Sequence, residues 1–305
     1  MLDFLRRWLD ELMTGCFLFL VLILVVLFPV DFATAGGRLF AQCILWSVGV
    51  LVALLLIAVR YTERVRPMLR VVFEIGPMVV AILGYTSLKL LHAAVITHWL
   101  GISSKDPWMM AADVALFSKT PYLWFAPWGL DSRLFLEVMS IFYGLYPWTP
   151  VIVLGWFMYK GDMKQLRLVR RTVLISLYCG YLCYIFFPVS GPLSLETPLK
   201  PIFVQSSLIY VFLMGNFRFA TDCFPSLHTA NPWLMVWLCR EKVPGWMLAV
   251  GAVVCTGITL STIALRFHYG IDDLAGLVWI FPMAVLARAT LPREMESRTP
   301  ISKNI

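Results

Sequence analysis

The chain has 305 residues, of which 60% are hydrophobic and only 14% are charged, and its mean hydropathy is +0.80. A soluble domain of this size cannot bury that much apolar surface, so an ordinary water-soluble enzyme is excluded. The 25 Lys and Arg against 18 Asp and Glu give a net charge of +7, which in a soluble protein could indicate nucleic-acid binding. Here the charges lie between apolar runs, and we expect no nucleic-acid partner.

Apolar runs recur along almost the whole chain, and each is long enough to cross a hydrocarbon layer of about 30 Å as a helix. In chain order the predicted spans are Thr14–Val30, Leu39–Val59, Val71–Ile96, Phe135–Tyr159, Thr172–Pro192, Ser226–Cys239, Trp246–Leu265 and Asp273–Thr290. We therefore predict an all-α integral membrane protein with about eight transmembrane helices. An N-terminal two-span addition (residues 1–66) would precede a six-span catalytic core (67–292) and a cytoplasmic tail (293–305).

The basic residues are distributed unevenly between the two sides that these spans define. With a cytoplasmic N-terminus, 17 of the 25 Lys and Arg fall on the cytoplasmic side and 7 on the opposite side. Positive residues favour the cytoplasmic side, so we place both termini there. The first apolar run, followed by Ala33-Thr34-Ala35, also imitates a cleaved signal peptide, and this alternative leaves the later topology unchanged.

Two further segments are apolar or aromatic but do not have the pattern of a span. Residues 97–133 are rich in Trp, Tyr and Phe and are interrupted by prolines. We predict an interfacial segment that either anchors the protein or shapes a lateral entrance for a lipid. Ile202–Met214 is predicted to be a short re-entrant or interfacial helix.

Two polar segments interrupt the apolar pattern at places where lipid would exclude them unless they had a function. They are Phe224–His228 and Arg266–Asp272. The predicted topology puts both on the outer face, at the two ends of a helical hairpin. Although their histidines are 40 positions apart in sequence, we expect them to be neighbours in space.

The residue types in these segments suit phosphate chemistry. Ser226 can cap a helix whose first-turn N–H groups bind an anion, and His228 projects from that turn. His268 and Asp272 are four apart, so the carboxylate can accept a hydrogen bond from one ring nitrogen and leave the other nucleophilic. Arg266 is a phosphate partner beside them.

A phosphate ester held between the histidines could undergo in-line displacement. His268 would attack phosphorus and His228 would protonate the departing oxygen, after which a second nucleophile would release the phosphohistidine. This chemistry requires no metal, and we expect no cofactor. A single histidine in a helix is more often a packing residue, and it is the pairing of two on one face that favours catalysis.

The same segments resemble the phosphatidic acid phosphatase type 2 superfamily. Pro225–His228 matches its Pro-Ser-x-His motif. Ser261–Asp272, followed by Asp273–Gly276, matches the last motif of the inositol phosphorylceramide synthase-like membrane branch, with serine seven residues before histidine and aspartate four after. Together the two motifs are specific, whereas Pro-Ser-x-His alone is weak.

The resemblance implies a six-span core from Val71 onward and a site with assigned roles. His268 would be the nucleophile, Asp272 its orienting partner and His228 the general acid and base. The substrate would be a lipid phosphate in the bilayer, and the acceptor would be water or a lipid or polyol hydroxyl. Candidate substrate-binding residues are Ser226, Ser261, Arg266, Arg218, Lys200 and Lys89.

The chain departs from the family at the basic residues that bind phosphate. Thr262 stands where family phosphatases commonly carry arginine, and Phe187–Leu193, at the place of the first motif, has no basic residue. Lys164–Arg171 imitates the spacing of that motif, but we interpret it as a cytoplasmic basic loop across the membrane from both histidines. Lys89 could pair with Glu137, contact the substrate headgroup or extend to the interface.

We therefore predict a membrane lipid phosphatase or phosphotransferase that works at the non-cytoplasmic face, periplasmic, exterior or luminal. A transporter or lipid flippase is the rival from another class, which inverted repeats with broken helices would support. A non-catalytic membrane partner is the third alternative, for which loss of His228, His268 or Asp272 would be the sign. All three residues are present.

Overall fold

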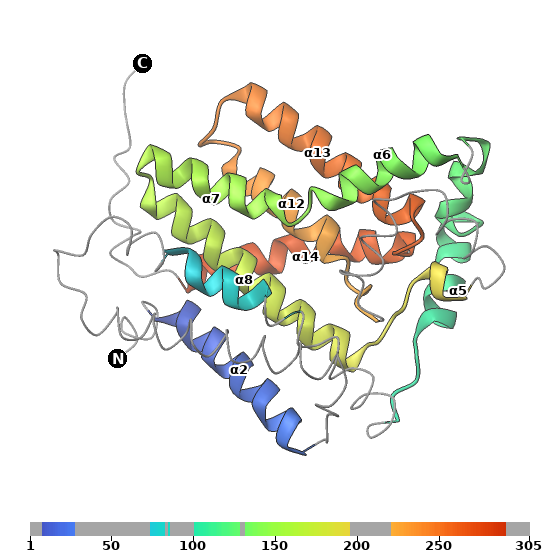
Figure 1. The fold of residues 1–305 in the computed structure, drawn as a ribbon, viewed down its shortest axis with the longest axis horizontal. Helices are drawn as coiled ribbons and strands as arrows, with labels where there is room; N and C mark the ends of the chain where they lie inside the picture. The colour runs from blue at the N-terminus through green and yellow to red at the C-terminus, as the bar shows by residue number, and fades with distance from the viewer. Residues whose placement is uncertain are drawn as a thin grey trace.

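The computed structural model describes residues 8–27, 74–82, 85, 101–128, 132–195 and 221–290. This part of the chain is helical for about 80% of its length and contains no β-strand. The elements are α2 (Leu9–Leu27), α5 (Asp106–Phe117), the 3₁₀ helix η2 (Pro121–Trp128), α6 (Arg133–Gly144), α7 (Trp148–Lys160), α8 (Met163–Phe186), α9 (Pro192–Leu195), α12 (Leu227–Cys239), α13 (Gly245–Ala264) and α14 (Gly270–Ala289) (Figure 1).

Three of these helices, α8, α13 and α14, are long and apolar enough to cross a membrane. The bent pair formed by α6 and α7 passes the same test as one broken span, which makes four. The protein is therefore an all-helical membrane protein. By length and composition, the described residues contain three or four spans, against about eight predicted for the whole chain. Leu39–Val59 and Ile202–Met214 lie outside the described residues, as does most of Val71–Ile96.

The predicted span Phe135–Tyr159 is present as a broken span and not as one straight helix. The helix ends at Gly144 and restarts at Trp148, with a bend of 43°. Pro147 explains the break, because proline has no N–H to donate and disfavours helical geometry in the residue before it. The predicted span Ser226–Cys239 also differs, since α12 has only 13 residues and a perpendicular span needs about 20.

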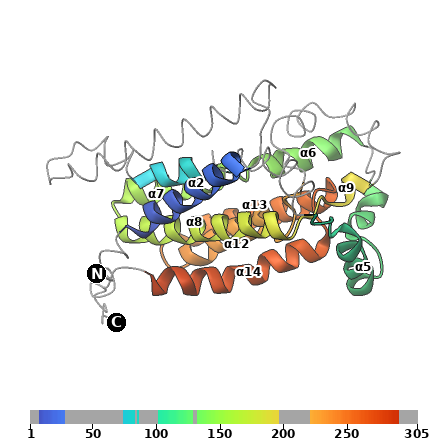
Figure 2. The same ribbon diagram turned by 90° about the horizontal axis from the view of Figure 1, so that it is seen from below.

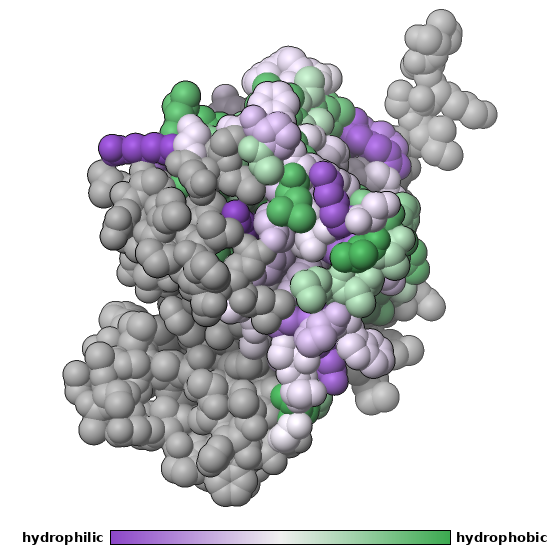
Figure 3. Space-filling model, turned by 90° about the vertical axis from the view of Figure 1, so that its right-hand side faces the viewer, coloured by the Kyte–Doolittle hydropathy of each residue, from purple (hydrophilic) through white to green (hydrophobic). Residues whose placement is uncertain are grey.

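Helix α8 forms the centre of the described bundle. Figure 2 shows α2 and α14 on opposite sides of α8, and α8 also packs against α7 and α12. Leu166, Leu174, Leu234 and Ala284 are fully buried where α8, α12 and α14 meet. The apolar side chains of α13 and α14 that face away from this core are exposed, as expected of surfaces that contact lipid tails. By contrast, hydrophilic and apolar side chains are interspersed on the end of the molecule that carries α5 (Figure 3).

A buried ion cluster joins four segments at the end of α8 where the chain enters it. Arg170 contacts Asp10 and Glu74, each at 2.6 Å. Arg171 bonds Asp10 at 2.7 Å and donates to the carbonyl of Thr290 at 2.7 Å. The cluster therefore ties α2 and the segment at Glu74 to α8 and to the end of α14.

We expect Asp10→Ala to destabilise this bundle by about 3–5 kcal/mol, because it leaves two buried guanidinium groups without their shared carboxylate. Unfolding in detergent micelles measures the effect. Glu241→Ala is the control, because Glu241 is 75% exposed beside Arg240, and loss of such a surface pair costs about 1 kcal/mol or less. Equal effects of the two substitutions would contradict the role given to the cluster.

Candidate active site

The structure brings the two predicted histidines together. His228 lies in the first turn of α12, and His268 lies in the loop between α13 and α14. Their ring centroids are 5.5 Å apart, with an angle of 60° between the ring planes. The hairpin of α12 and α13 achieves this, because its two open ends are both at the end of the bundle opposite to the ion cluster.

His268 is held in a defined orientation by a main-chain carbonyl. Its Nδ1 lies 2.9 Å from the carbonyl oxygen of Cys223. A carbonyl can only accept, so Nδ1 carries a proton, and in the neutral ring the lone pair is on Nε2. The sequence predicts Asp272 as the acceptor, but its Oδ2 is 3.7 Å from Nδ1, which is too long for a hydrogen bond. That oxygen instead accepts the N–H of Tyr269 at 2.8 Å and caps α14.

The segment that contains this carbonyl is fixed on three sides. The N–H of Cys223 bonds the carbonyl of Val189 at 3.2 Å, beside a parallel bridge between Val189 and Asp222. The Cys223 thiol donates to the carbonyl of Phe267 at 3.0 Å. The Asp222 carboxylate accepts the hydroxyl of Tyr85. The acceptor for His268 is therefore positioned by contacts that leave it little freedom.

The charge around His268 is predominantly negative. Burial alone would lower the pKa of His268, but the neighbouring carboxylates of Asp272, Asp273 and Asp222 raise it above its ordinary value. The carboxylates thus stabilise the imidazolium form, and a nucleophilic Nε2 requires that the ring lose this proton.

Asp273 joins three helices directly beneath the histidines. Its carboxylate accepts the hydroxyl of Thr229 at 2.6 Å and the hydroxyl of Thr262 at 2.9 Å. These contacts connect α12, α13 and α14. They also give a physical role to the departure at Thr262, because a threonine satisfies the buried Asp273 where family phosphatases commonly carry arginine. Asp273 was missed by sequence reasoning, although it directly follows the predicted Asp272.

His228 lies between two tyrosine rings contributed by the broken helix pair. Tyr143, in the last turn of α6, stacks on it at 4.6 Å between centroids with an interplanar angle of 23°. Tyr146, in the α6–α7 break, lies at 4.2 Å and accepts the side-chain amide of Asn231 at 3.2 Å. Nδ1 of His228 is buried and has no hydrogen-bond partner among the described residues. The break in the predicted span therefore supplies the walls around this histidine.

Each motif serine bonds within its own helix, and Ser226 also interacts with the Asp273 carboxylate of α14. Ser226 is the N-cap of α12, and its hydroxyl oxygen accepts the N–H of Thr229 at 3.3 Å. The hydroxyl of Ser261 donates to the carbonyl of Ile258 at 2.6 Å. Both side chains are fully buried, so their observed role is to shape the helix ends beside the histidines.

Arg266 stands in the same loop as His268. Its backbone is in the left-handed region, with φ of +62°, and its carbonyl accepts the N–H of Leu193. The guanidinium carbon lies 4.8 Å from the ring centroid of Tyr122 in η2, and the residue is buried. The other predicted phosphate cations, Lys89, Lys200 and Arg218, lie outside the described residues.

The loop at the place of the first family motif carries no basic residue, and its main-chain N–H groups instead bind the carboxylate of Asp106. The Asp106 carboxylate accepts the N–H of Ser190 at 3.0 Å and of Gly191 at 2.9 Å, as well as the hydroxyl of Tyr269 at 3.1 Å. Gly191 has φ of +83°, and a Cβ there would lie 2.1 Å from the carbonyl oxygen of Phe267. Only glycine allows this close approach to the loop that carries His268.

A second buried acid on α5 supports the start of α14. Asp113 accepts the N–H of Gly270 at 3.1 Å and of Ile271 at 2.9 Å. Asp106 and Asp113 were missed by sequence reasoning, which treated this segment as an anchor or a lipid entrance. Their spacing of seven residues, two turns on one face of an apolar helix, is the pattern that could have indicated them.

Lys164–Arg171, the segment that imitates the first motif, lies at the other end of α8. Arg171 belongs to the buried ion cluster. Pro188, just beyond the opposite end of α8, precedes Val189, whose carbonyl accepts the N–H of Cys223 beside the histidines. Arg171 is 17 residues before Pro188, a distance of roughly 25 Å along a helix. This basic segment is therefore remote from the histidines.

One group of described residues has metal-ligating atoms close together. Cys223, His268 and Asp272 offer a sulfur, a nitrogen and an oxygen within 4.8 Å of one another. In the structure Nδ1 of His268 is hydrogen-bonded to a carbonyl and Oδ2 of Asp272 to a main-chain N–H. A metal ion would have to displace both bonds.

A partly buried histidine and a buried one thus lie close together in a bundle whose helices α8, α13 and α14 are long and apolar enough to cross a membrane. A family model described as the PAP2 superfamily matches residues 107–286, which is more than half of the chain. The protein belongs to the PAP2 superfamily, and this membership supports a phosphatase-type enzyme that acts on a lipid phosphate. No curated protein and no solved structure gives a significant match.

We expect Asp272→Asn to lower the pKa of His268, because it removes a nearby negative charge while the amide oxygen can still accept the N–H of Tyr269. The chain has four histidines, so histidine-selective NMR titration in micelles can follow each ring. Asp162→Asn, at the N-cap of α8, is the matched control. An unchanged titration of His268 in the Asp272 variant would show that the charge of Asp272 does not act on the ring.

Proposed function

We propose that the protein is a lipid phosphatase or lipid headgroup phosphotransferase whose intermediate is a phosphohistidine at His268. The observation that carries the proposal is the histidine pair: ring centroids 5.5 Å apart, with Nδ1 of His268 bound to a carbonyl and Nε2 left as a nucleophile. The site would face the non-cytoplasmic side, with both termini cytoplasmic. The distribution of Lys and Arg supports this orientation.

In the first step Nε2 of His268 attacks phosphorus and the bond from phosphorus to the ester oxygen breaks. His228 gives its proton to the departing oxygen, so the alcohol leaves neutral. In the second step water or an alcohol attacks phosphorus, His228 takes the proton from the attacking oxygen, and the phosphorus–nitrogen bond breaks. The negative charge of a bound phosphate favours the protonated His228 that the first step needs.

Phosphate binding is supported by the N-terminus of α12 and by Arg266. First-turn N–H groups and the helix dipole attract an anion, and His228 lies in that turn. Arg266 stands two residues before His268 and has a fixed backbone conformation. The acidic surroundings of His268 make this positive contribution necessary, because a phosphate dianion would otherwise be repelled.

The motif from Ser261 to Gly276 favours the inositol phosphorylceramide synthase-like branch, in which the acceptor is water or a hydroxyl of a lipid or polyol. Phosphatase and transferase share every residue described above. We distinguish them by incubating purified protein with a radiolabelled lipid phosphate, with and without candidate alcohols. Label released as inorganic phosphate in both conditions identifies a phosphatase, and label in a new ester identifies a transferase.

We expect His268→Asn to reduce turnover of a lipid phosphate by roughly 10³-fold or more. Rapid quenching should trap alkali-stable, acid-labile phosphate on the wild-type chain and none on the variant. His228→Ala should slow cleavage of an alkyl phosphate by at least about 10²-fold. With p-nitrophenyl phosphate the same substitution should impair the first step much less, because p-nitrophenolate leaves without needing a proton. The second step still needs His228 as a base, so phosphoenzyme should accumulate. Turnover that persists in His268→Asn would refute the proposal.

A further inference from the structure

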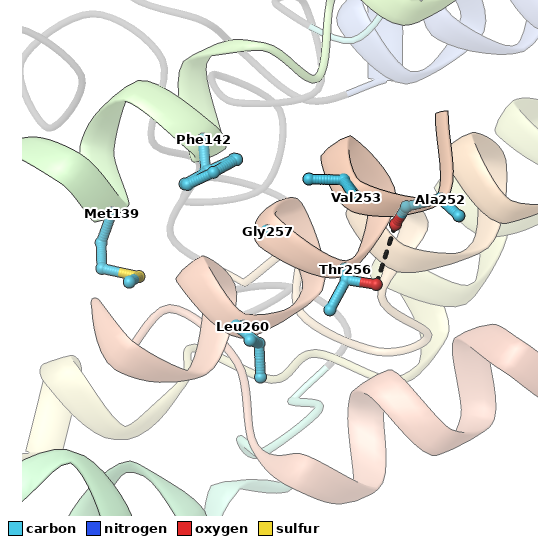
Figure 4. Close-up of a pocket in the computed structure, with 7 residues that line it drawn as sticks. All are labelled: Met139, Phe142, Ala252, Val253, Thr256, Gly257 and Leu260. Atoms are coloured by element: carbon cyan, nitrogen blue, oxygen red, sulfur yellow. Dashed lines mark hydrogen bonds between the residues drawn. The ribbon is translucent and has the colours of Figure 1, made fainter. Parts of the chain in front are cut away.

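An apolar groove runs between α6 and α13 on the outside of the bundle. It encloses about 390 Å³. Its lining comes from both helices: Met139, Phe142, Ala252, Val253, Thr256, Gly257 and Leu260. Figure 4 shows the α6 side chains on one side and those of α13 on the other, with Phe142 above Gly257.

The lining of the groove suits hydrocarbon. None of the lining residues is charged, and the one hydroxyl, on Thr256, donates to the carbonyl of Ala252 at 2.8 Å (Figure 4). That hydroxyl is therefore satisfied within its own helix. Gly257 determines the shape, because a Cβ there would lie 2.2 Å from the ring of Phe142. The missing side chain lets the two helices approach and leaves a channel beside the ring.

The groove and the histidine site use neighbouring residues of the same two helices. Phe142 precedes Tyr143, whose ring stacks on His228. The same tyrosine ring lies 4.7 Å from that of Phe267, next to His268. On α13, Leu260 directly precedes Ser261 near the end of the helix that leads to this loop.

The direction and length of the groove fit one extended chain. From Leu260 to Ala252 the lining extends over eight helical steps of α13, which is about 12 Å, the length of roughly ten carbon atoms in an extended chain. A lipid whose phosphate lies between the histidines would place its chain at the Leu260 end and continue along α13, away from the site.

We propose that this groove binds one hydrocarbon chain of the lipid phosphate substrate and thereby selects substrates by chain length. The proposal rests on the proposed function and deepens it. The position of the groove beside the site distinguishes this occupant from bulk lipid, because Phe142 of its lining directly precedes Tyr143, which stacks on His228. A chain attached to a phosphate between the histidines would therefore enter the groove at its Leu260 end. Each methylene that lies in the groove adds apolar contact and strengthens binding. Methylenes beyond the end of the groove add none of this contact.

The test uses a series of n-alkyl phosphates from butyl to hexadecyl with the full chain in micelles. For the wild type, kcat/KM should rise with chain length and level off at roughly ten carbons. Thr256→Leu fills the groove, so the rise should stop at shorter chains, with a loss on the order of tenfold for hexadecyl phosphate and little change for butyl phosphate. Val278→Leu, at a 67%-exposed position on α14 outside the groove, is the matched control and should behave as the wild type.

A binding measurement separates this inference from the proposed function. An alkyl phosphate with a photoreactive group near the chain end should label residues 252–260 in the wild type and also in His268→Asn, which lacks the nucleophile. The groove would be overturned if the wild type turns over alkyl phosphates but Thr256→Leu has the same dependence of kcat/KM on chain length. It would also be overturned if the photoreactive label spread equally over α14. Labelling of residues 252–260 without turnover of any ester would overturn the proposed function and leave the groove in place.

Discussion

Main-chain N–H groups in loops between membrane helices need partners inside the protein, because water is scarce there. Around the histidines, buried aspartates supply them. Asp106 binds the turn at Ser190 and Gly191, Asp113 binds the first N–H groups of α14, and Asp272 binds the N–H of Tyr269. These bonds hold the two loops that face His228 and His268, and the rest of the site depends on them.

This solution has an electrostatic consequence. Burial alone would lower the pKa of His268, but Asp272, which also satisfies the Tyr269 N–H, acts with Asp273 and Asp222 to raise it. The nucleophile is therefore oriented by a neutral carbonyl, that of Cys223, and tuned by carboxylates at greater distance. A direct histidine–carboxylate hydrogen bond would both orient the ring and stabilise its positive charge. Here the carbonyl of Cys223 orients the ring, and the carboxylates stabilise its charge. The division explains why the position of Cys223 is fixed by so many contacts.

The sequence predicts the proximity of the two histidines better than it predicts the fold around them. His228 and His268 could be found because short motifs place them at the ends of one hairpin, and the hairpin geometry follows from hydrophobic spacing alone. The break at Pro147 was missed, because the apolar run continues across it and hydropathy does not register a bend. Asp106 and Asp113 could not be assigned, since their partners are main-chain groups 84 and 157 residues away that no side-chain pattern reveals.

The same break connects recognition of the headgroup to recognition of the chain. Tyr143, before the break, and Tyr146, within it, both place their rings against His228. Phe142, one residue before Tyr143, lies against Gly257 of α13, and Met139, about one turn earlier, lines the same groove. One short segment therefore contacts the imidazole with one residue and borders the groove with the residue before it. A chain lying in the groove and a phosphate lying at His228 would be aligned by the same turn of helix.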